Sequence, residues 1–164
     1  MKKSFTIIET LVAITIFTLG VIILGVSIWQ SYSLASQATQ RFIAIYLAQE
    51  GLEIVKNLRN ENWLNQRTWN YNLNQGDYEA DYKSDSLTRC SIPCNFNNLR
   101  FLNLESSGFY SYSGNILTPF KRKISISYPA QDQMKVTVTV YWPKKGSGGQ
   151  EQVSVAEILY NWNQ

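Results

Sequence analysis

The sequence predicts an α+β fold in which one long N-terminal helix packs against an antiparallel β-sheet. Three observations lead to this fold. Residues 11–29 are uncharged and mostly apolar, the apolar spacing of a helix then continues to about Asn60, and the last third of the chain alternates in β-branched residues. The residues after Trp29 are enough for one domain with a modest core and too few for two.

The apolar stretch is long enough to cross a membrane. At a rise of about 1.5 Å per residue, residues 11–29 span roughly 28 Å, close to the thickness of the hydrocarbon core. Lys2 and Lys3 precede the stretch, and cationic flanks stay on the cytoplasmic side. The residues after Trp29 are therefore expected outside the cytoplasmic membrane. A secretory signal peptide would have a shorter apolar core, and a plain single-span anchor explains all but the residues around Glu9.

Glu9 is an acid near the head of this apolar segment. A carboxylate at mid-membrane costs about 2.5–3.5 kcal/mol unless it finds a partner. Two arrangements would remove this cost. Either Glu9 lies shallow enough to reach headgroup water, or a positive group on another copy of the protein neutralises it.

The first residues resemble the type IV pilin and pseudopilin superfamily. Lys2-Lys3-Ser4 followed by FTIIETLVAI is similar to the leader and the start of the mature protein in that family. The resemblance implies that a prepilin peptidase cuts between Ser4 and Phe5 and methylates the new amine of Phe5. It also implies that Glu9 pairs with this amine on a neighbouring subunit. The chain departs from the family at Ser4, where nearly all members have glycine.

The resemblance implies a domain organisation and a function. Residues 1–4 are the leader, 5–29 the transmembrane and assembly half of the helix, 30–60 its amphipathic half, and 61–164 the globular domain. The function implied is a structural subunit of a type IV pilus or a secretion pseudopilus. Its partners are other pilin subunits, the prepilin peptidase, the inner-membrane assembly platform and, before assembly, membrane lipid. The junction LAQEGLEIVKNLRN resembles minor pilins and pseudopilins, although major and minor subunits are not separated by it.

The alternative function comes from another class of protein. A single-span protein could present an extracytoplasmic domain that binds a ligand or an adhesive partner without polymerising. An enzyme is not expected, because the chain has no histidine and therefore lacks the commonest general base and zinc ligand. No cofactor and no metal site are predicted.

The amphipathic half of the helix carries its apolar residues at spacings of three and four, which predicts one buried face. The opposite side is polar. Gly20 and Gly25 interrupt the membrane half, where they either allow the helix to bend or let neighbouring helices approach closely. The predicted buried face consists of Leu34, Ala38, Phe42, Ile45, Ala48, Leu52, Val55 and Leu58.

The sheet is predicted from three β-rich runs near 121–128, 135–142 and 152–159. Short connections between them imply an antiparallel meander whose apolar face packs on the helix. In the middle run, Val136, Val138 and Val140 share one face.

Two cysteines and a group of acids remain. Cys90 and Cys94 are expected to form a disulfide, because an even count outside the membrane favours one. Asp77, Glu79 and Asp81 alternate with apolar residues, which predicts a solvated strand face. Calcium is the alternative for these acids together with Asp85, although a loop with a regular ligand pattern is lacking.

The basic residues after Pro119 allow two interpretations. Five cations near aromatic residues are compatible with DNA binding. Cations near strand starts and turns more often lie in solvent at the edge of a sheet, where they oppose aggregation. The net charge of +3 is also too small to indicate that the protein binds nucleic acid through its overall charge. DNA is therefore a weaker candidate partner than other subunits. The cations are Lys121, Arg122, Lys123, Lys144 and Lys145.

Overall fold

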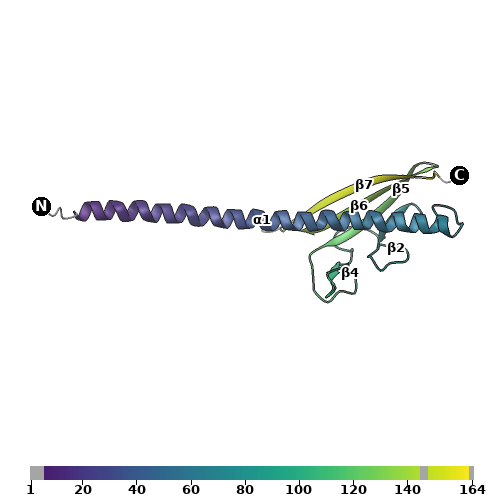
Figure 1. The fold of residues 1–164 in the computed structure, drawn as a ribbon, viewed down its shortest axis with the longest axis horizontal. Helices are drawn as coiled ribbons and strands as arrows, with labels where there is room; N and C mark the ends of the chain where they lie inside the picture. The colour runs from purple at the N-terminus through teal and green to yellow at the C-terminus, as the bar shows by residue number, and fades with distance from the viewer. Residues whose placement is uncertain (1–5, 145–147, 163–164) are drawn as a thin grey trace. The chain divides into compact units, whose positions relative to one another are not determined.

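The computed structural model describes residues 6–144 and 148–162. Within them, helix α1 (Ile7–Leu64) is followed by strands only (Figure 1). The chain divides into two compact units, residues 1–40 and 41–164, and α1 contributes to both. The first unit is helical wherever it is described, apart from Thr6. The second unit holds the rest of α1 and all the strands.

The second unit contains a five-stranded antiparallel sheet in the order β2-β1-β5-β6-β7. Its long strands are β5 (Lys121–Ala130), β6 (Gln133–Pro143) and β7 (Gln150–Tyr160), and the short ones are β1 (Gly76–Glu79) and β2 (Thr88–Arg89). A separate antiparallel pair joins β3 (Asn103–Leu104) to β4 (Tyr110–Ser111). Each long strand extends beyond its predicted range at one or both ends.

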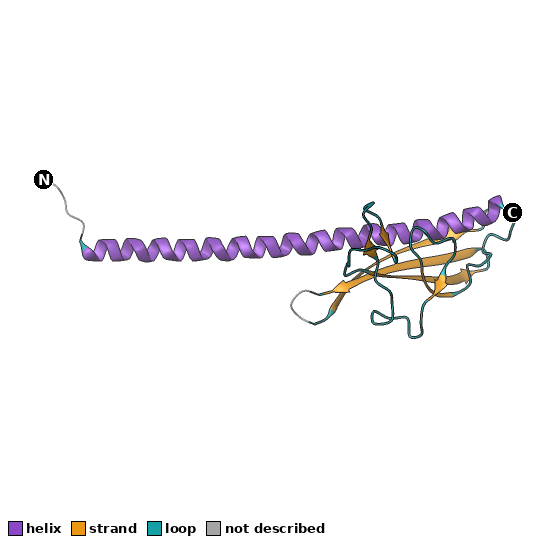
Figure 2. Cartoon of the chain, turned by 90° about the horizontal axis from the view of Figure 1, so that it is seen from below, coloured by secondary structure: helices purple, strands orange, loops and turns teal. Residues whose placement is uncertain are grey.

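The predicted α+β fold is confirmed, since α1 packs against this sheet (Figure 2). Val136, Val138 and Val140 of β6 are fully buried, as the alternation of the sequence predicts. Each such side chain contributes about 1.5–3 kcal/mol when it leaves water. The helix side of this core consists of Ala44, Leu47, Ala48, Gly51, Leu52, Ile54 and Val55.

The buried face of α1 differs in part from the predicted one. Ala48, Leu52 and Val55 are buried as expected, but Phe42 is 63% exposed and Leu34 is 66% exposed. Ala44 and Leu47 are buried in their place. The face that contacts the sheet is therefore rotated relative to the predicted stripe.

Gly51 lies in close contact with the sheet. A Cβ atom at this position would lie 2.8 Å from Cγ1 of Val138 and 3.0 Å from Cδ of Arg122. Both neighbours are fully buried, so neither has room to move away. The absence of a side chain at Gly51 thus sets the distance between helix and strand.

The helix ends at Leu64, a little later than the predicted end near Asn60. Gln66 has a φ of 56° and occupies the left-handed position that closes a helix. Its N–H donates to the Trp63 carbonyl over 3.0 Å, and that of Arg67 donates to the Asn62 carbonyl over 2.8 Å. These two bonds satisfy carbonyls of the last turn and direct the chain back over the helix.

Candidate functional site

The first candidate site is the part of α1 that lies in the first unit. Every large apolar side chain from Ile7 to Leu34 is exposed, with exposed fractions between 51% and 83%. Among the described residues, α1 is also the one helix long and apolar enough to cross a membrane. Burial of each such side chain is worth about 1.5–3 kcal/mol, so this surface requires lipid or protein around it.

Several hydroxyl side chains of this segment donate hydrogen bonds within the helix. Thr15, Thr18, Ser27 and Ser31 each donate to the carbonyl oxygen four residues earlier, over 2.8 or 2.9 Å. A hydroxyl that bonds to its own helix carries no unpaired donor into an apolar environment. These four residues therefore do not oppose burial of the segment.

Glu9 lies in the first turn of α1 and is exposed. Its backbone N–H donates to Oγ1 of Thr6 over 3.3 Å, so Thr6 caps the helix, and a negative charge in the first turn is favourable next to the helix N-terminus. The carboxylate forms no hydrogen bond or ion pair with a residue that the structure describes. Ser4 and Phe5, the expected processing site, lie outside the described residues.

The second unit holds a buried cation that ties α1 to the sheet. Arg122 of β5 is completely buried. Its Nη1 donates to the carbonyl of Leu47 in α1 over 2.8 Å, and its Nε donates to the carbonyl of Ala80 over 3.2 Å. The same Nη1 lies 3.5 Å from Oε1 of Glu50, a buried oxygen that accepts no hydrogen bond from the described residues. Burial raises the pKa of Glu50, although the positive charge of Arg122 opposes the rise.

The interpretation of the basic residues as solvated strand edges is wrong for two of them. Lys121 is 5% exposed and Arg122 is not exposed at all. The Lys121 ammonium donates to the Phe96 carbonyl over 2.7 Å and lies 4.7 and 4.1 Å from the ring centres of Phe96 and Phe101. Neither cation is exposed enough to contact a phosphate, which removes two of the five cations from the expected DNA footprint. Lys145 lies outside the described residues.

The interpretation of the alternating acids as a solvated face is also wrong for two of them. Glu79 and Asp81 are 5% and 7% exposed. Glu79 accepts the backbone N–H of Arg100 over 2.7 Å and forms an ion pair with its Nε at 3.2 Å. Asp81 accepts a hydrogen bond from the backbone N–H of Tyr112 over 3.0 Å and another from the hydroxyl of Ser84 over 2.7 Å.

These partners replace calcium as an explanation for the acids. Burial raises the pKa of Asp81, but the hydrogen bonds from Tyr112, Ser84 and Lys83 outweigh it and hold that pKa below its usual value. The acids act as acceptors that fasten distant loops to the end of β1. Across the described chain, no three acidic or cysteine side chains gather in a way that could hold a metal ion.

The disulfide loop covers the outer face of the sheet. Cys90 and Cys94 are bonded to each other. Cys90 is buried and packs with Leu99 and Tyr141, and the ring of Phe96 meets that of Tyr141 at 6.5 Å. This cover explains why Tyr141 is buried although it points away from the helix.

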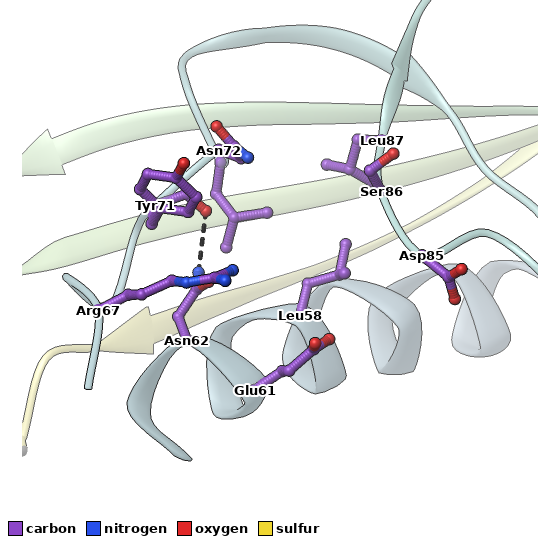
Figure 3. Close-up of a pocket in the computed structure, with 10 residues that line it drawn as sticks. Leu58, Glu61, Asn62, Arg67, Tyr71, Asn72, Asp85, Ser86 and Leu87 are labelled. Carbon is purple, nitrogen blue, oxygen red and sulfur yellow. Dashed lines mark hydrogen bonds between the residues drawn. The ribbon is translucent and has the colours of Figure 1, made fainter. Parts of the chain in front are cut away.

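The globular unit also has a small hollow at the end of α1 (Figure 3). Asn62 bridges its two walls by donating to the carbonyl of Tyr71 over 2.9 Å. The hollow has a volume of about 60 Å³, which holds a few water molecules and no larger ligand. Its other lining residues include Leu58, Glu61, Arg67, Asn72, Asp85, Ser86 and Leu87.

Comparison with family models, with characterised proteins and with solved structures finds no match in any of the three.

Proposed function

We propose that the chain is a structural subunit of a type IV pilus or pseudopilus that polymerises through the first half of α1. The observation that carries the proposal is the apolar surface of residues 7–34, which is exposed along its whole length and headed by a single acid. An apolar surface of this size must be covered in the working protein. Either lipid or other helices can cover it.

The hydrogen bonds of the hydroxyl groups within the helix are compatible both with lipid and with other helices around the segment. Because Thr15, Thr18, Ser27 and Ser31 satisfy their own donors, the segment keeps the same hydrogen bonds in a bilayer and in a bundle of helices. A subunit of this kind lies in the cytoplasmic membrane first, with its N-terminus inside and the sheet domain outside. It then leaves the bilayer for a filament.

In this proposal, Glu9 determines how far neighbouring helices are offset from each other in the filament. Cleavage between Ser4 and Phe5 would free an amine at Phe5. An amine of one subunit paired with the Glu9 carboxylate of its neighbour would remove the cost of burying both charges and would fix the offset between two helices. The prepilin peptidase and the assembly platform of the inner membrane would act before this step.

Mass spectrometry of the N-terminus of the native protein tests processing. A mature chain that starts at N-methylated Phe5 is the expected result. The variant Ser4→Gly should be processed at least as fast as the natural sequence, since glycine is the usual residue before the cut. A mature native chain that keeps Met1 and stays monomeric in the membrane would overturn the proposal in favour of a single-span binding protein.

Filament incorporation tests the role of Glu9. The variant Glu9→Ala should enter filaments far less than the natural chain. Glu53→Ala is a matched control, because Glu53 is an exposed acid on the same helix within the second unit. Normal incorporation of the Glu9 variant would refute the register role.

A further inference from the structure

The last strand of the sheet has a free edge. β7 pairs with β6 from Gln150 to Tyr160 without a register shift, and its other edge pairs with no strand of the described chain (Figure 1). β7 also has no proline. Proteins usually block long edges with prolines, bulges or short strands, since an open edge is a template for another strand. β7 lacks these protections.

A groove runs beside this edge. Its walls are residues 157–160 at the end of β7, Lys56 and Arg59 of α1, and Trp162, and its volume is about 560 Å³. Four consecutive strand residues therefore line one side, and a helix lines the other. A groove between a strand edge and a helix has the shape that an extended peptide fills when it adds to a sheet.

Arg59 is a buried cation at this groove. The residue is 8% exposed, and it forms no ion pair with a described residue. Its Nε and Nη2 donate to Oδ1 of Asn60 over 3.3 and 3.1 Å, and its guanidinium carbon lies 4.7 Å from the ring centre of Trp63. These bonds use two of the five N–H donors of the guanidinium. The remaining donors, including both on Nη1, have no acceptor among the residues that the structure describes.

The other charges around the groove are already paired. Lys56 lies 2.8 Å from Oε2 of Glu157 and 3.0 Å from Oε1 of Glu53. Arg59 is thus the cation that a ligand can pair with. A carboxylate is the acceptor that fits, because it receives two parallel N–H bonds from an arginine.

Aromatic rings complete the groove. Trp162 is 76% exposed and meets Trp63 edge to face at 5.7 Å, while Tyr160 is 48% exposed. These rings offer apolar surface to the side chains that flank a bound carboxylate.

We propose that the groove between β7 and α1 binds an extended segment of another polypeptide, which pairs with the free edge of β7 and places an acidic side chain on Arg59. The backbone hydrogen bonds of the added strand provide affinity, and Arg59 provides selectivity for the acid. The interaction does not depend on polymerisation through the first half of α1, so it goes beyond the function proposed above.

Peptide binding to the full-length chain in detergent micelles tests this inference. The probe is a short fluorescent peptide of alternating threonine and valine with one central glutamate, and its partner carries glutamine instead. Fluorescence anisotropy should show saturable binding of the glutamate peptide and at least about tenfold weaker binding of the glutamine peptide, since a charged hydrogen-bonded pair is worth about 1.5–3 kcal/mol. Arg59→Gln should abolish the difference between the two peptides.

Two controls separate the strand edge from the charge. Arg67→Gln should change nothing, because Arg67 also lies against an aromatic ring, at 5.2 Å from Tyr71, but outside this groove. A glutamate peptide with methylated backbone nitrogens at alternate positions should lose binding, since it cannot pair with β7. Circular dichroism checks that the Arg59→Gln variant is folded. The comparison of the glutamate and glutamine peptides tests the role of the peptide's charge on the unaltered protein.

Several results would overturn the proposal. They are the absence of saturable binding, equal binding of the glutamate and glutamine peptides, and undiminished binding of the methylated peptide. A dimer of the purified chain that competes with the peptide would assign the edge to a second copy instead.

Discussion

Replacing Arg122 with methionine should strongly destabilise the second unit. The change removes charged hydrogen bonds to the carbonyls of Leu47 and Ala80, and it leaves Glu50 without its positive neighbour. Loss of one partner of a buried ion pair costs about 3–5 kcal/mol. The Glu50 side chain is 32% exposed, so water compensates part of this loss. We therefore expect a loss of about 3 kcal/mol in the free energy of unfolding.

Urea unfolding of the full-length protein in a mild detergent, followed by near-ultraviolet circular dichroism, measures this loss. The double variant Arg122→Met with Glu50→Gln should lose less than the single variant, because it leaves no buried carboxylate unpaired. The two variants together with Glu50→Gln alone form a cycle that isolates the coupling between the two side chains.

The loss should also depend on pH. Burial raises the pKa of Glu50 in the folded protein, and Arg122→Met removes the charge that opposes this rise. A group with a raised folded pKa stabilises the fold below its unfolded pKa and loses this contribution as pH rises through the folded value. The penalty of Arg122→Met should therefore increase between about pH 4 and pH 7. A penalty below about 1 kcal/mol, or one that is equal at both pH values, would refute the reasoning.

Three further perturbations have expected outcomes. Gly51→Ala gains about 1 kcal/mol of helix propensity but forces a Cβ to 2.8 Å from Val138, so it should lower the free energy of unfolding by about 1–2 kcal/mol. Hydrogen bonds from Lys83 and Ser111 lower the pKa of Glu105 to about 2, so the protection of amides around β4 against hydrogen exchange, relative to their intrinsic rates at each pH, should fall as pH falls from about 4.5 towards 2, and Glu105→Gln should remove this dependence. Cys90→Ser with Cys94→Ser should cost at most about 2 kcal/mol in urea unfolding, because the disulfide closes a very small loop.

Matched outcomes test these expectations. Gly20→Ala places its Cβ where nothing lies within 4 Å, so it should not share the penalty of Gly51→Ala. A stabilised Gly51→Ala protein would mean that the sheet can move away from α1. If protection against hydrogen exchange falls in acid to the same extent in Glu105→Gln, another group causes the effect.

Periodicity in the sequence predicted the layers of the fold but not every contact. A spacing of three and four placed Ala48, Leu52 and Val55 on the core, and alternation placed Val138 there. Phe42 is exposed instead, because residue type alone does not determine which side of an apolar stripe turns towards the sheet.

Charge alone predicts that Lys121 and Arg122 are exposed, whereas their position in the strand decides their burial. Alternation along KRKISISY puts Arg122 on the same face as Ile124 and Ile126, which are both buried. This signal could have identified Arg122. The partners of Glu79 and Asp81 could not have been found in this way, since Arg100 and Tyr112 lie far along the chain in irregular segments.

The apolar half of α1 was recognised from composition and from the residues around Glu9. The groove beside Arg59 has no comparable signal, because it forms only where the end of β7 meets α1. Local patterns predict surfaces on one element, whereas a groove between elements depends on how they pack.

The order of elements has a consequence for folding during synthesis. The ribosome completes the core stripe of α1, including Leu47 and Val55, long before β5, β6 and β7. At the usual rate of synthesis this delay is on the order of 5–20 s. During that time an apolar helix face has no sheet to cover it, and the pairing of β1 with β5 must also wait. A chaperone that shields this face would therefore act on nascent chains, and the yield of folded protein should depend on how fast the last strands arrive.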